Sequence, residues 1–288
     1  MILQLLLNGI IKGTVLGLIA LGFSLVYYTT RIFHIVYAFL FVFSAYIFYA
    51  CKILAGINFV IAFLISAIAT VLLSLGTDIL YKVFEKNKGT KNMMLIVSLA
   101  IYLIGISIIS IFFGVESITH GNVSSSAYTF QGILLTNSQI LQLTLSLSLS
   151  AIVIYFLFWS SLGLKIRALR DNALLLGLLG KNKTSIRSSV FALSGFIVCI
   201  PACLISADKG IDPFSGMQII LVAVVAMILG GKATFTASII GGLLIGISQS
   251  ISIMFLDPKW EPLITFGILI IILLYLPNGL FGEYKRAV

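Results

Sequence analysis

The feature that most constrains this chain is a series of long apolar stretches separated by short polar segments. One of them runs from Met93 to Phe113 without a charged residue. A helix of about 20 apolar residues crosses a hydrocarbon core of about 30 Å, and several stretches have a comparable length. The sequence is also 60% hydrophobic and only 9% charged, which is too little charge to cover a soluble domain. We therefore predict an all-α fold, a polytopic transmembrane helical bundle.

The spans are expected at nine places in a single transmembrane domain that covers residues 1–288. They are residues 13–30, 32–51, 55–77, 93–113, 139–162, 188–206, 216–229, 236–255 and 263–276. A count of eight stays open, because the N-terminal segment or one short span could be re-entrant. No linker or second domain is expected.

The distribution of basic residues predicts the orientation. Lys and Arg gather in residues 78–92 and 163–187, whereas residues 114–138 contain neither. Loops rich in Lys and Arg stay on the cytoplasmic side, so we expect the C-terminus inside and the N-terminus outside. The net charge of +9 then reflects orientation and does not call for a nucleic-acid partner.

Residues 163–187 form the most basic segment and contain a short helical pattern of their own. Asp171 or Asn172 is placed to cap a helix over residues 173–179, and Gly180 is a typical residue to follow its end. This helix would present a group of leucines, namely Leu174, Leu175, Leu178 and Leu179. Two interpretations stay open: the helix rests on lipid headgroups, or it docks into a cytoplasmic partner.

The same segment resembles the cytoplasmic loop of permeases from branched-chain amino acid ABC importers. The residues that match that loop are Arg167, Ala168, Leu178, Leu179, Gly180 and Asn182, while Lys181 replaces an aliphatic residue. Further along, residues 211–216 read IDPFSG where the family has I-N-P-x-x-G. The family's signature glycines, which we also expect to serve in helix packing, correspond to Gly230, Gly231, Gly241, Gly242 and Gly246. In the first span, Gly9, Gly13 and Gly17 recur every four residues and predict a surface of small residues for close helix packing. A closing motif matches at Pro277, Gly279, Leu280, Phe281 and Gly282.

The resemblance implies the permease subunit of an ATP-binding cassette importer of the branched-chain amino acid or urea type, in a bacterial inner membrane. It would carry a small polar solute, with a branched-chain amino acid as the model. Its partners would be a second permease subunit (a paralogue or a copy), two cytoplasmic ATPase subunits and an extracytoplasmic substrate-binding protein. The residues that would couple it to the ATPase are Arg167, Arg170, Asp171, Leu174, Leu175, Leu178, Leu179 and Gly180. The acids that would face the binding protein are Glu116, Asp208, Asp212, Asp257 and Glu261.

The chain departs from the family in the second span. The family has a polar I-N-F-A-H-G segment, and here His34 takes the place of the Asn and Tyr37 that of the His. Candidates for lining a translocation path are Ser24, Tyr27, His34, Tyr37 and Ser44. Polar residues within membrane spans usually face the bundle interior. Packing without a role in transport stays the alternative.

No catalytic, cofactor or metal site is expected. Cys199 and Cys203 share a helix face without a His or a carboxylate beside them, so small-residue packing is the simpler interpretation. The segments GLLGKNKT and LGGKAT lack the G-x-x-x-x-G-K-[ST] spacing of a phosphate loop, which leaves ATP hydrolysis to another polypeptide. The rival functions are a stand-alone secondary transporter or channel and, further off, an integral membrane enzyme.

Overall fold

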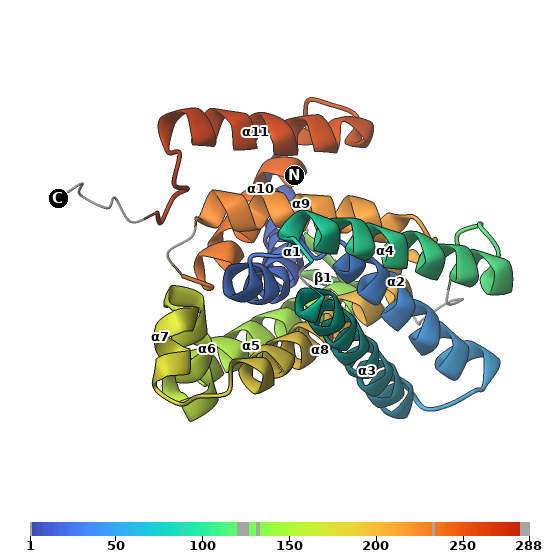
Figure 1. Cartoon of the computed structure of the whole chain (residues 1–288). Helices are drawn as coiled ribbons and strands as arrows, with labels where there is room; N and C mark the ends of the chain where they lie inside the picture. The colour runs from blue at the N-terminus through green and yellow to red at the C-terminus, as the bar shows by residue number, and fades with distance from the viewer. Residues whose placement is uncertain (1, 88, 120–126, 131–132, 232–233, 283–288) are drawn as a thin grey trace. The chain divides into compact units, whose positions relative to one another are not determined.

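The computed structural model describes residues 2–87, 89–119, 127–130, 133–231 and 234–282. Figure 1 labels most of the helices and the first strand. The helices are α1 (Ile2–Thr30), α2 (Val36–Tyr49), the π-helical η1 (Ala50–Leu54), α3 (Phe59–Lys86), α4 (Lys91–Phe113), α5 (Asn137–Trp159), α6 (Ser161–Asp171), α7 (Ala173–Leu178), α8 (Lys183–Lys209), α9 (Ser215–Gly230), α10 (Ala237–Ser252), the 3₁₀ turn η2 (Pro258–Trp260) and α11 (Glu261–Tyr275). Two short strands, β1 (Ala127–Phe130) and β2 (Ile133–Thr136), pair antiparallel.

Within the described residues, seven helical segments are long and apolar enough to cross a membrane. The helices α9 and α10 are apolar but shorter. Together they fit the predicted fold class, a polytopic α-helical bundle with about eight or nine spans.

Several predicted boundaries are wrong. The helix α1 begins at Ile2 and not near residue 13, since the residues before Lys12 contain no proline to interrupt the helix. The helix α2 begins at Val36, so His34 precedes the helix and does not lie within it. The helix α3 continues to Lys86 through a segment that we expected to be a loop. The residues from 78 onward stay helical because their polar side chains find partners on α8, as described below.

The polar segments also contain more structure than expected. Residues 114–138, predicted to be a loop, include the β1–β2 hairpin, in which Ala127 pairs with Thr136 and Phe130 with Ile133. Residues 163–187 are mostly helical, because α6 precedes the predicted short helix. Its start is capped by Ser160, whose side chain accepts a hydrogen bond from Gly163 N at 2.8 Å.

The chain forms two compact units, which we describe separately. One consists of Met1–Ser24, Ser124–Ser150 and Gln218–Val288, and the other of Leu25–Val123 and Ala151–Met217.

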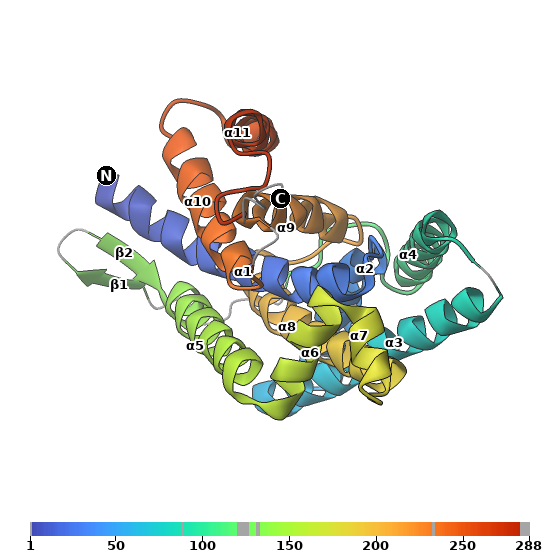
Figure 2. The ribbon, with the colours of Figure 1, turned by 60° about the vertical axis from the view of Figure 1, so that its left-hand side comes forward.

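In the first unit, the start of α1 lies against α10 over a row of glycines (Figure 2). A Cβ added at Gly246 would lie 2.3 Å from Gly13 Cα, and one added at Gly242 would lie 2.3 Å from Gly17 Cα. The predicted small-residue packing surface is therefore confirmed, because only glycine permits this backbone approach.

In the second unit, α2, α3 and α8 pack against one another, and α4 covers α2. Both Cys199 and Cys203 are buried here as free thiols, in a cluster with Phe48, Ala62 and Ala67. The expectation that these cysteines serve in packing is confirmed.

Candidate functional site

The short helix α7 is held at both of its ends. Asn172 Oδ1 accepts hydrogen bonds from Leu174 N at 3.1 Å and Leu175 N at 3.0 Å, which satisfies two of the free donors at a helix start. Gly180 has a positive φ of 71°, the conformation that glycine favours after a helix end. The predicted helix is confirmed to within one residue, with Asn172 as its cap.

The leucines of this segment face away from the protein. The exposed fractions are 76% for Leu174, 57% for Leu175, 85% for Leu178 and 67% for Leu179. Leu176, in contrast, is buried, and α7 packs against α6 and α8. The segment is thus anchored by one leucine and presents four others on its outer side, three of them on α7 and Leu179 directly after it.

The charged coupling candidates lie on α6. Arg170 Nε is 2.8 Å from Asp171 Oδ1. The guanidinium of Arg167 lies 5.0 Å from the centre of the Phe158 ring and donates a hydrogen bond to Phe158 O at 3.2 Å. These contacts hold both arginines close to the surface of their own unit.

A buried charge cluster between α3 and α8 was missed by the sequence analysis. Asp78, whose side chain is 1% exposed, lies 2.8 Å from Arg187 Nε and also pairs with Lys82. Arg187 reaches Glu85 as well, and Ser188 Oγ donates to Asp78 Oδ2 at 2.8 Å. Only the α3 half of the cluster had a signal in the sequence, since positions 78, 82 and 85 share one face of a helix.

The polar residues proposed for a translocation path are mostly engaged with neighbouring groups. His34 is fully buried, with Nδ1 2.9 Å from the Tyr81 hydroxyl and the Phe191 ring centre 5.3 Å from its own. The His34 and Tyr37 ring centres are 6.4 Å apart.

The serines among these candidates are also bonded. Ser44 Oγ lies 3.0 Å from Ser66 Oγ, and Ser24 donates to Leu21 O within α1. Tyr27 stacks edge-on against Phe33 at a ring-centre distance of 6.3 Å. His34, Tyr37, Ser44 and Tyr27 belong to the second unit and Ser24 to the first.

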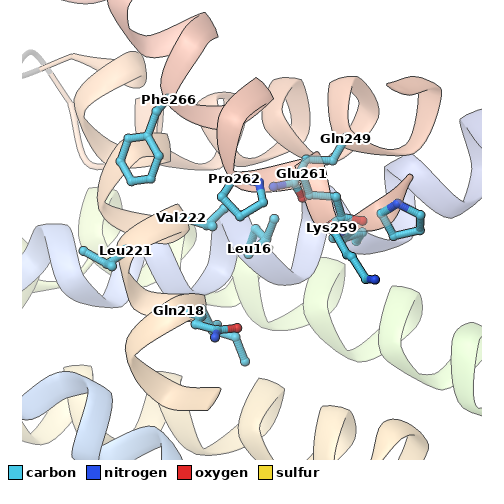
Figure 3. A pocket seen from close by; sticks show the side chains of 12 residues that line it. Leu16, Gln218, Leu221, Val222, Gln249, Lys259, Glu261, Pro262 and Phe266 are labelled. Carbon is cyan, nitrogen blue, oxygen red and sulfur yellow. The ribbon is translucent and has the colours of Figure 1, made fainter. Parts of the chain in front are cut away.

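A cavity of about 520 Å³ lies within the first unit (Figure 3). Its walls come from α1, α9, α10, η2 and α11. Lys12 Nζ and Glu261 Oε2, both on its lining, form an ion pair at 2.6 Å. Glu261, which lies between two predicted spans, is the first residue of α11. The five path candidates do not line this cavity.

These features define the class of protein: a multi-pass membrane protein whose chain carries an exposed apolar helix between its spans. Over residues 5–273 the sequence matches the family described as "Branched-chain amino acid transport system / permease component". The chain belongs to this family.

Curated relatives align along almost the whole chain. The high-affinity branched-chain amino acid transport system permease protein BraD of Pseudomonas aeruginosa is 25% identical, over 98% of this chain and 96% of its own. The protein LivH of Escherichia coli K12, described in the same words, is 24% identical over the same shares. A probable LivH of Methanocaldococcus jannaschii is 26% identical over 98% and 94%.

A solved structure shares the fold. It is described as PsaBC from Streptococcus pneumoniae in complex with Fab, and it superposes with a TM-score of 0.52 at 12% identity. The superposition covers 97% of this chain and 94% of that one, and at this identity it supports the fold alone.

Family membership decides between the functional classes considered above. The chain is a transport permease and not an enzyme, and the stand-alone transporter is not favoured. Permeases of this family work within ABC importers, together with ATPase and binding-protein partners.

Proposed function

We propose that this chain is the permease subunit that carries a branched-chain amino acid, or a small polar solute like it, through a bacterial inner membrane. It would pair with a second permease, and two separate ATPase subunits would supply the energy. The support comes from the curated relatives, whose names assign them to branched-chain amino acid transport.

The observation that carries the ATPase part of the proposal is the exposed face of α7. Four leucines there are each more than half exposed, although removing one such side chain from water is worth about 1.5–3 kcal/mol. The helix is capped at its start and followed by a glycine in the left-handed conformation. Its conformation is therefore fixed before a partner binds. We infer that these leucines fill a cleft of the ATPase when the importer is assembled.

The neighbouring ionic residues support the same role. α6 packs against α8, and Arg187 ties α8 to Asp78 of α3. A displacement of α7 by the ATPase would therefore be transmitted to α8 by packing and to α3 by the ion pair. We propose that Arg167, Arg170, Asp171 and Gly180 keep α6 and α7 in the geometry that docking requires.

Three of the acidic residues predicted to face the binding protein are Glu116, Asp208 and Asp212. They would lie on the side of the membrane opposite to α7, and their positions support docking of a binding protein on that side. Ile118 and Ile211 exchange backbone hydrogen bonds of 2.9 Å, which brings the segment of Glu116 close to that of Asp212. Both Glu116 and Asp208 are exposed, while Asp212 Oδ1 accepts bonds from Phe214 N and Ser215 N. We propose that this end faces outward, with the C-terminus inside.

The test is a double substitution, Leu175→Asp with Leu178→Asp, compared with Leu175→Met and Leu178→Met. The charged pair should abolish co-purification of the ATPase and solute uptake at an unchanged level of inserted protein. The methionine pair keeps the apolar surface and should retain both. Normal ATPase yield with the charged pair would instead leave α7 as a helix that rests on lipid.

A further inference from the structure

The cavity of the first unit has a polar side and an apolar side. In the view of Figure 3, Gln249, Glu261 and Lys259 gather on one side, whereas Phe266, Leu221 and Val222 lie toward the other. Its volume of about 520 Å³ falls in the range of about 300–1,000 Å³ that is usual for small-molecule sites.

The polar side contains one charge of each sign in direct contact. Lys12 belongs to α1, which is otherwise without charge from Ile2 to Thr30, and its Nζ lies 2.6 Å from Glu261 Oε2. Their side chains stay 31% and 25% exposed, so a ligand can reach both. An ionisable residue within a membrane span is costly and generally marks a function.

Gln249 adds an acceptor that the described part of the chain does not satisfy. The residue is 2% exposed, and its Nε2 donates to Thr265 Oγ1 at 2.6 Å. Its Oε1 is buried without a hydrogen-bond partner among the described residues. Such a group costs about 1–3 kcal/mol unless a donor reaches it, and the residue lines the cavity.

We propose that this cavity binds the zwitterion of an aliphatic α-amino acid, an inference that rests on the proposed function and deepens it. The ligand carboxylate binds Lys12 Nζ, and the ligand ammonium binds Glu261 and donates to Gln249 Oε1. Each ligand charge then lies beside its opposite, so that Lys12 and Glu261 both keep a counter-ion. The aliphatic side chain of the ligand packs against Leu16, Val222 and Phe266.

The charge balance favours a zwitterion over a simple ion. A carboxylate without an ammonium would bind Lys12 but repel Glu261, and an amine without a carboxylate would do the reverse. A zwitterionic lipid headgroup such as phosphatidylethanolamine offers the same pair of charges, so the experiment has to separate the two sources.

Binding is measured on the purified full-length chain in nanodiscs of phosphatidylglycerol. L-leucine should bind at least about tenfold more tightly than 4-methylpentanoate, which lacks the ammonium, or 3-methylbutylamine, which lacks the carboxylate. Lys12→Met and Glu261→Gln should each weaken L-leucine binding by about tenfold or more, the loss of one charge-assisted contact. Lys209→Met changes a lysine at the end of α8 that does not line the cavity. It is the control and should bind normally.

If loss of the ion pair prevents folding, Val222→Phe provides a second test of the same site. It leaves every charge in place and fills the apolar side, so L-leucine affinity should fall relative to that for L-alanine. An unchanged ratio of the two affinities would overturn the proposal, as would wild-type leucine binding by folded Lys12→Met or Glu261→Gln.

The lipid arm adds phosphatidylethanolamine to the nanodiscs. If this lipid binds through Lys12 and Glu261 while L-leucine does not bind to the wild type, the occupant is a headgroup and the proposal is wrong. That result would leave ATPase docking and uptake intact, so failure of this site and failure of the proposed function are distinguishable.

Discussion

Arg187 Nε lies 2.8 Å from Asp78 Oδ1, and this ion pair joins α8 to α3 across 109 positions of the sequence. The two side chains are 11% and 1% exposed. Arg187 also pairs with the more exposed Glu85. A buried charge is costly without its partner, so the contact fixes which turns of α3 and α8 face each other.

We therefore expect Arg187→Met to destabilise the protein by about 3–5 kcal/mol, the usual cost of breaking a buried pair. The control is Glu85→Gln, which removes the outer partner and should cost no more than about 1 kcal/mol. The stability of both variants is measured in detergent, as the fraction of protein that stays monodisperse after heating. Equal stability of the two variants would show that the buried pair contributes little.

The contact of α1 with α10 is tested by adding a single methyl group. Gly246→Ala would place a Cβ 2.3 Å from Gly13 Cα, so the helices must separate, at a cost of about 1–3 kcal/mol. Gly267→Ala on α11 is the control, since a Cβ there meets nothing within 4 Å. The yield of folded protein should fall only for Gly246→Ala.

Local patterns in the sequence predicted the helices and their packing surfaces well. The glycine row of α1, the cap Asn172 and the turn at Gly180 depend on neighbours in the sequence or on residue size, so each could be predicted. The two buried cysteines followed from residue type and spacing in the same way.

What the sequence did not predict depends on partners far along the chain. Asp78 was assigned to a loop because a charged residue normally ends an apolar span. No residue near it in the sequence indicates that Arg187 is its partner. The pair of Lys12 and Glu261 is separated by 249 positions and was missed for the same reason. His34 likewise lies before the start of α2 at Val36, where its Nδ1 contacts the hydroxyl of Tyr81, 47 positions further along the chain.

The orientation can be tested by thiol labelling in whole cells, after replacement of Cys51, Cys199 and Cys203. A cysteine at the exposed Glu116 should react with an impermeant reagent. A cysteine at the exposed Lys181 should react only after the membrane is opened. The reverse pattern would invert the proposed topology and, with it, the side on which α7 meets an ATPase.

The last prediction concerns His34, where the sequence departs from the family pattern. His34 Nδ1 lies 2.9 Å from the Tyr81 hydroxyl, and its Nε2 is buried without a hydrogen-bond partner among the described residues. A polar group in an apolar interior is costly unless it is bonded. From this second nitrogen we propose that His34 serves in the path and not in packing alone.

We expect His34→Leu to reduce uptake per assembled complex by about tenfold, a barrier of about 1.4 kcal/mol, because a polar group is lost from the path. His34→Asn restores the residue usual in the family and should retain uptake or shift the solute preference. Tyr81→Phe is the matched control: it removes the bond to Nδ1 but leaves Nε2, so uptake per complex should stay normal even where yield falls. If His34→Leu and Tyr81→Phe lower only the yield, and to the same extent, His34 serves in packing and the path lies elsewhere.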